Sequence, residues 1–97
     1  MIQHVVLFRF RADADPARLV QTAQALRDMQ GRIPEVRAVS FGPNLGPSAR
    51  DWSHVLVVSC DDMDAVHRYI DHPVHRETVE RYITPIRDAR LAVDVET

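Results

Sequence analysis

The sequence predicts a single α+β domain in which strands and helices follow one another in the order β-α-β-β-α-β. Four segments are rich in β-branched and aromatic residues, and the segments between them repeat apolar residues at helical spacing. A chain of 97 residues suits one domain over residues 1–97 and not two. Apolar residues make up 45% and charged residues 27%, which is typical of a globular domain and not of a disordered segment.

The first half of the chain opens with a strand over residues 2–10 that is apolar on both faces at its centre. Asp15 and Pro16 predict the N-cap and first residue of a helix over residues 16–30, and Gly31 predicts where it ends. The run 36–41 predicts a second strand, followed by a loop rich in glycine and proline.

The second half continues with a third strand over residues 52–60, again apolar on both faces. Asp61 or Asp62 predicts the N-cap of a short helix that carries Tyr69. That helix ends at His72, because the residue before a proline avoids the α conformation. A further helical segment over residues 74–83 follows Pro73, and residues 90–95 alternate as the last strand.

This order of elements fits a ferredoxin-like protomer, an antiparallel sheet with both helices on one face. Two helices cover one face only, whereas both central strands are apolar on both faces. If Val6, Phe8, Leu56 and Val58 stayed in water, they would form the kind of apolar patch that marks an interface. We therefore expect a second copy of the sheet to cover these residues in a homodimer with C2 symmetry.

The composition excludes several classes of function. The net charge is -2 without a basic stripe, so nucleic acid is not an expected partner. All 12 cationic residues are arginine, and the absence of lysine excludes Schiff-base chemistry. Cys60 is the only cysteine, which excludes an intramolecular disulfide and CxxC motifs. No signal peptide or membrane span is recognisable, so we expect no membrane partner and a cytoplasmic location.

Five segments carry a resemblance to a known family: His4–Phe10, Ile33-Pro34, Gly42–Asn44, Ser53–Val55 and, most specifically, Tyr69–His75. In their order and spacing the chain resembles, over essentially its full length, the stress-responsive dimeric α/β-barrel (Dabb) family. The resemblance implies that two ferredoxin-like protomers form a dimeric α/β barrel around a cavity. The family includes a plant polyketide cyclase, which performs an aldol condensation without a metal or organic cofactor.

The resemblance implies Tyr69 and His75 as catalytic residues and His4 and His54 as substrate-binding residues. A neutral His75 would take a proton from carbon next to a carbonyl, and the Tyr69 hydroxyl would donate to the resulting enolate. His4 and His54 share a strand parity, so we expect them to meet inside the barrel. The alternatives are that His75 caps or packs its helix, that Tyr69 packs on the sheet, and that the other two histidines form a buried pair.

His72 and His75 also have the spacing of a metal-binding pair. The intervening proline bend breaks helical i, i+3 geometry, and no cysteine or carboxylate set completes a coordination shell, so we expect neither a metal nor a cofactor.

The leading functional hypothesis is therefore a small-molecule protein with an apolar cavity, acting as a polyketide-cyclase-like enzyme on an apolar or phenolic ligand. One alternative is a ligand-binding or stress-associated protein without chemistry, and another is a cofactor-free monooxygenase. Fold alone does not decide among them.

Overall fold

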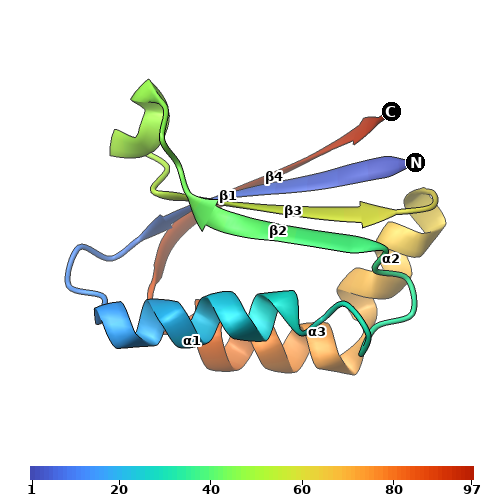
Figure 1. Cartoon of the computed structure of the whole chain (residues 1–97), viewed down its shortest axis with the longest axis horizontal. Helices are drawn as coiled ribbons and strands as arrows, with labels where there is room; N and C mark the ends of the chain where they lie inside the picture. Colours follow the sequence, from blue (N-terminus) through green and yellow to red (C-terminus); the bar gives the residue numbers. More distant parts are fainter.

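Four antiparallel strands form one sheet in the order β2-β3-β1-β4. In this computed structural model, which describes residues 1–97, the strands are β1 (Ile2–Phe10), β2 (Ala38–Pro43), β3 (His54–Cys60) and β4 (Arg87–Glu96). β1 and β3 occupy the centre, and the two chain ends lie at the same end of the sheet (Figure 1). The arrangement is the ferredoxin-like α+β fold that the order of elements predicts.

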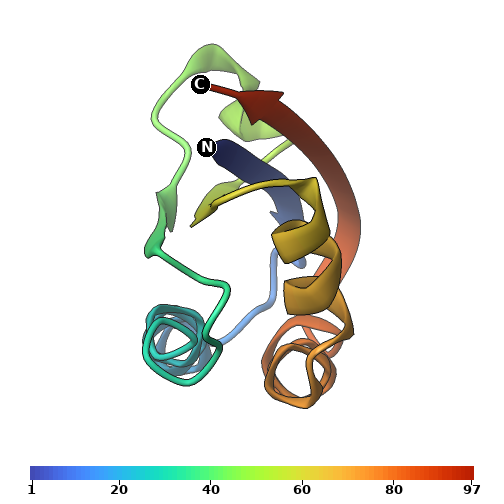
Figure 2. The same cartoon turned by 90° about the vertical axis from the view of Figure 1, so that its right-hand side faces the viewer.

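The helices all lie on one face of this sheet (Figure 1). They are α1 (Pro16–Arg27), α2 (Met63–Asp71) and α3 (Pro73–Thr78), which continues into the π-helical turn η2 (Val79–Ile83). In the end view α1 lies beneath the β2 edge, whereas α2 and α3 lie toward the β4 edge (Figure 2). A short 3-10 helix, η1 (Pro47–Arg50), interrupts the loop between β2 and β3. No helix combines the length and the apolar character needed to cross a membrane.

The local signals in the sequence place both ends of β1 and the beginning of α1 correctly, whereas β2 begins and ends two residues later than expected and β3 begins two residues later. The Asp15 carboxylate accepts a hydrogen bond from the N–H of Ala17 at 2.9 Å and begins α1 as expected. The helix ends at Arg27 rather than residue 30, because the chain then continues in tight turns to Gly31, whose φ of 96° favours glycine. At the other end of the chain, β4 begins at Arg87, three residues earlier than the alternation indicates.

The patch expected at the dimer interface lies instead in the core of the protomer. Val6, Phe8, Leu56 and Val58 are all at most 4% exposed, because their face of the sheet is the one that the helices cover. Our choice of face was wrong: both faces of the strands are apolar, so the alternation cannot tell which one meets the helices.

The opposite face of the sheet carries the exposed apolar surface. Leu91, Val93 and Val95 on β4 are 46%, 50% and 52% exposed. Leu91 pairs with Leu7 and Val93 with Val5, so these β4 side chains lie on the β1 face that points away from the helices. An uncovered apolar patch remains, on the other side of the sheet from the one predicted.

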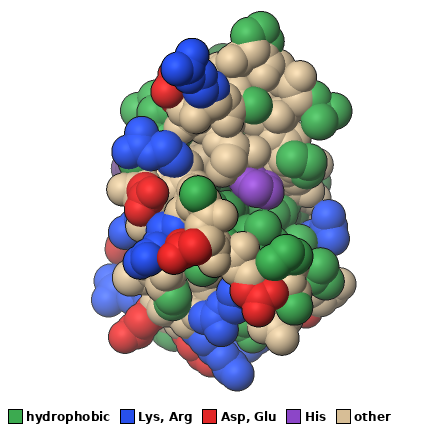
Figure 3. Space-filling model, turned by 90° about the vertical axis from the view of Figure 1, so that its left-hand side faces the viewer, with side chains coloured by type: hydrophobic (Ala, Val, Ile, Leu, Met, Phe, Trp, Pro, Cys, Tyr) green, Lys and Arg blue, Asp and Glu red, His purple; other side chains and the backbone are tan.

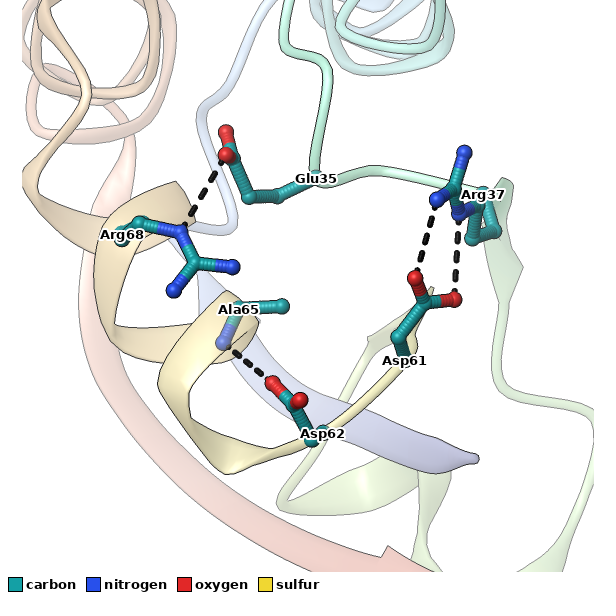
Figure 4. Close-up of polar contacts among 6 residues, drawn as sticks. All are labelled: Glu35, Arg37, Asp61, Asp62, Ala65 and Arg68. Atoms are coloured by element: carbon teal, nitrogen blue, oxygen red, sulfur yellow. Dashed lines mark hydrogen bonds and ion pairs between the residues drawn. The ribbon is translucent and has the colours of Figure 1, made fainter.

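Polar contacts tie the entry into β2 to α2 and to the residues that precede it (Figure 4). Arg37 donates two hydrogen bonds to the Asp61 carboxylate, at 3.1 and 2.9 Å, and Arg68 donates one to Glu35 at 3.3 Å. The neighbouring Asp62 accepts from the N–H of Ala65 at 2.8 Å and is the N-cap. These contacts set the position of α2, the helix that carries Tyr69.

Candidate functional site

A small pocket lies between the covered face of the sheet and the segment α2–α3–η2. Its volume is about 140 Å³. Cavities of about 150 Å³ hold a benzene ring in other proteins, so this one suits a body of about one ring. The lining residues are His4, Val6, Phe8, Leu26, Leu56, Tyr69, Ile70, His75, Val79, Ile83, Arg87 and Arg90.

The proline break between α2 and α3 brings Tyr69 and His75 together. His72 takes an extended conformation (ψ 137°), and its Nδ1 accepts a hydrogen bond from the N–H of Val74 at 3.1 Å, which caps α3. Tyr69 is in the last turn of α2 and His75 in the first turn of α3, with ring centroids 4.7 Å apart in an edge-on arrangement. His72 is therefore the N-cap of α3, whereas His75 contacts the last turn of α2 through the Ile70 carbonyl.

The orientation of the His75 ring leaves one nitrogen free to act as a base. Its Nδ1 lies 2.8 Å from the carbonyl oxygen of Ile70. A carbonyl oxygen only accepts, so Nδ1 carries the proton and Nε2 holds the lone pair in the neutral ring. Burial lowers the pKa of His75, the Ile70 hydrogen bond opposes this with a smaller effect, and the neighbouring His4 and Arg90 lower the pKa further. The imidazole is accordingly neutral at pH 7.

Tyr69 offers a hydroxyl donor at the same pocket. The residue is 1% exposed, and burial raises its pKa well above the usual value, so the phenol stays protonated. Its hydroxyl has no hydrogen-bond partner in the chain, yet it is not among the completely buried polar atoms that lack a partner. The hydroxyl is therefore accessible from the pocket and free to donate to a ligand.

His4 lies next to Tyr69, and a hydrogen bond to a carboxylate fixes the position of its ring. Its ring centroid is 5.9 Å from that of Tyr69, and its Nδ1 lies 2.7 Å from Oδ1 of Asp94 on β4. Because the carboxylate accepts, Nδ1 of His4 carries a proton. Asp94 was not predicted from the sequence; the signal that would have found it is the antiparallel register that pairs His4 with Asp94.

His54 lies apart from this group, contrary to our expectation that it would meet His4. β3 pairs Val58 with His4 and Phe8 with His54, which separates the two histidines by about 13 Å along the strands. The His54 ring stacks on Phe41 at 5.6 Å in a groove between α1 and β2, and burial lowers its pKa. Figure 3 shows the molecule from the left-hand side of Figure 1, where hydrophobic side chains lie next to a histidine.

The expected location of the cavity, inside the barrel between two sheets, also needs correction. His4, Tyr69 and His75 face a pocket between the sheet and the helices of the same protomer. The reason is the same as for the apolar patch: the strand face that carries His4 is the one that the helices cover.

The remaining polar groups give no further centre near the pocket. No group of three or more His, Cys, Asp or Glu side chains is arranged to hold a metal ion. Cys60 is fully buried, and burial raises the pKa of its thiol, which favours a packing role over a nucleophilic one.

Comparison with known families agrees with the fold. The model of the Dabb family, the stress-responsive A/B barrel domain, matches residues 2–97. The chain belongs to this family. An uncharacterised relative, SCO4036 of Streptomyces coelicolor, is 30% identical over 81 residues, which span 81% of this chain and 84% of the relative.

Solved structures place this Dabb domain among dimeric ferredoxin-like proteins. A dimeric protein of unknown function from Thermobifida fusca is 32% identical, with a TM-score of 0.83 over 99% of this chain and 90% of that one. A hydroxynitrile lyase from Passiflora edulis is 16% identical, with a TM-score of 0.84 over 97% and 90% of the two chains. At that identity the likeness concerns the fold alone.

Proposed function

We propose that this Dabb protein is a cofactor-independent enzyme that enolises a small carbonyl compound and directs it into an aldol-type carbon–carbon bond reaction. The observation that supports this most is the pairing of two free groups at one pocket. The Nε2 of His75 is a neutral base, the Tyr69 hydroxyl is an unpaired donor, and their rings are 4.7 Å apart.

In the proposed reaction, His75 Nε2 removes a proton from the carbon next to the substrate carbonyl. The electron pair of that C–H bond moves into the carbonyl, and the Tyr69 hydroxyl donates a hydrogen bond to the enolate oxygen. The enolate carbon then forms a bond to a second carbonyl carbon of the same molecule, and the His75 imidazolium returns its proton to the resulting alkoxide. Protons and electrons balance without a metal or redox partner.

The pocket volume restricts the substrate. About 140 Å³ accommodates a body of one ring, so a polyketide-like substrate would have to be short or leave part of its chain outside. The reverse reaction, cleavage of a carbon–carbon bond next to a hydroxyl, uses the same two groups. The hydroxynitrile lyase of similar fold shows that the architecture accommodates a lyase.

Deuterium exchange at the α-carbon of a ring-sized ketone such as acetophenone in D2O tests the first step directly. We expect the protein to accelerate exchange and His75→Ala to lower the rate about 100-fold or more, the usual contribution of a general base. His67→Ala, which changes an exposed histidine on α2, is the matched control and should leave the rate unchanged. Equal rates for the native protein and His75→Ala would contradict the proposal.

The second candidate is a ligand-binding protein without chemistry. It is favoured by the fact that His4 and His75 both use Nδ1 in hydrogen bonds within the chain, as buried structural histidines do. A ligand that raises the melting temperature and is recovered unchanged, without α-exchange, would support it. Oxygen consumption with a quinol would instead identify a cofactor-free monooxygenase.

The uncovered face of the sheet supports a second proposal, that the protein is a homodimer. The exposed residues Leu91, Val93 and Val95 need an apolar partner, and the Thermobifida fusca protein of similar fold is dimeric.

A further inference from the structure

Two arginines line the rim of the pocket beside the proposed acid–base pair. Arg87 and Arg90 both come from β4, and both contribute to the wall that also contains Tyr69 and His75. Burial is the largest influence on the pKa of both His75 and Tyr69, and the charge of Arg90 has a smaller effect that lowers both. As part of the pocket wall, Arg90 can contact a ligand that occupies the pocket.

An irregularity in β4 brings both arginines to the same face of the sheet. Residues three apart on a regular strand point to opposite faces. Here Arg90 pairs with Phe8 and Arg87 pairs with Phe10, and the register shifts between Arg9 and Phe10 so that Asp88 is left without a partner. Such a bulge redirects a side chain, and bulges are frequent next to active sites.

Neither arginine has a counter-ion in the chain. The ion pairs of the protein involve other residues, and neither Arg87 nor Arg90 takes part in one. The carboxylate on the same stretch of β4, that of Asp94, is held by His4 at 2.7 Å. Asp88 acts elsewhere: together with Asp13, which has the larger effect, it raises the pKa of Arg11. Two free guanidinium groups thus border an apolar pocket.

From this arrangement we propose that the ligand of the pocket is a small carboxylate, with an apolar body of about one ring and an acid group that binds Arg90 with Arg87 beside it. A guanidinium binds a carboxylate through two parallel hydrogen bonds, which fixes orientation as well as charge. The apolar part then lies among Val6, Phe8 and Leu56, next to the free groups of Tyr69 and His75.

The proposed carboxylate ligand occupies the pocket of the proposed enzyme reaction, but its binding does not depend on that reaction. A carboxylate anchored at the rim presents the rest of the ligand to His75 in one orientation, which is what an acid–base reaction requires. A binding protein without chemistry would use the same anchor.

Calorimetric titration of the full-length protein with benzoate and with benzamide, its neutral counterpart of the same size, tests the ligand class. We expect benzoate to bind at least about tenfold tighter than benzamide at low salt, since a hydrogen bond to a charged group contributes more than a neutral one. Arg90→Gln should remove that preference and leave benzamide binding unchanged, while Arg90→Lys should restore it only in part.

Arg50→Gln is the matched control, because it removes the same charge from an exposed residue of η1 far from the pocket residues. It should leave the preference for benzoate intact. Equal affinities for the two ligands, or no binding of either at millimolar concentration, would overturn the inference. So would an equal loss of the benzoate preference in Arg90→Gln and Arg50→Gln. His75-dependent exchange is unaffected by those outcomes. Conversely, a retained benzoate preference without exchange would contradict the proposed chemistry and leave the ligand class standing.

Discussion

At the scale of single residues, the site depends on which nitrogen of each histidine is engaged. The Ile70 carbonyl and the Asp94 carboxylate each accept a hydrogen bond from an Nδ1, so Nδ1 carries a proton in both His75 and His4, and the neutral His75 ring has an unprotonated Nε2. Burial keeps His75 neutral and keeps Tyr69 protonated. The two residues therefore hold opposite roles, base and donor, at the same pH.

A neutral His75 beside a protonated Tyr69 predicts how the rate of deuterium exchange at the α-carbon depends on pH. The rate should be constant above pH 7, where His75 is already neutral, and should fall with decreasing pH only below the ordinary histidine value of 6.5, because the pKa of His75 is lowered. The pKa of Tyr69 is raised above 10, so no basic limb should appear below pH 10. Exchange rates measured from pH 5 to pH 10 test this (~10-fold loss per pH unit on the acid limb). An acid limb centred above pH 7 would contradict it.

The site residues that the sequence predicts differ in a physical way from those that it does not predict. Tyr69 and His75 were found because a proline in one short segment determines their relation. Asp94, Arg87 and Arg90 were missed because their positions depend on strand pairing between segments about 80 or more residues apart, which no local pattern encodes.

At the scale of elements, three local irregularities build the pocket. The break at His72-Pro73 turns α3 away from α2, the π-helical turn carries Val79 and Ile83 into the wall, and the β4 bulge brings Arg87 alongside Arg90. π-turns and bulges both occur preferentially at functional sites. The sequence predicts the first through its proline. The other two leave no such mark, because a π-turn and a bulge each need only one extra residue.

The alternation of residues along the central strands likewise does not predict which face of the sheet the helices cover. The bounds of β1 follow from its composition, and its two apolar faces correctly indicate that both need a cover. Which face receives the helices is decided by the handedness of the whole fold. His54 was misplaced because the antiparallel register pairs it with Phe8 and pairs His4 with Val58.

At the scale of the whole molecule, the helix-free face of the sheet is where we expect a second copy to pack. The exposed side chains Leu91, Val93 and Val95 form a row along β4 beside Val5 and Leu7. Burying each such side chain contributes about 1.5–3 kcal/mol, so covering the row favours association. The pocket opens on the other side of the sheet, and each protomer thus carries its own site.

A charged substitution on the helix-free face of the sheet should prevent the dimer from forming. Val93→Arg should convert the dimer into monomers, because it places an unpaired charge in the apolar contact. Val20→Arg, at a residue of α1 that is 71% exposed, is the control and should remain dimeric. Analytical ultracentrifugation at micromolar concentration distinguishes the two. A native protein that sediments as a monomer would disprove the dimer.

The proposed chemistry requires that His75 present an unprotonated Nε2 to the pocket at neutral pH. Long-range proton–nitrogen NMR spectra of the histidine rings test it most directly, since they separate the two neutral tautomers from the charged ring. At pH 7 we expect a neutral His75 with its proton on Nδ1, and a shift of the Nε2 signal when a pocket ligand is added. A His75 ring that is charged at pH 7, or that carries its proton on Nε2, would contradict the account.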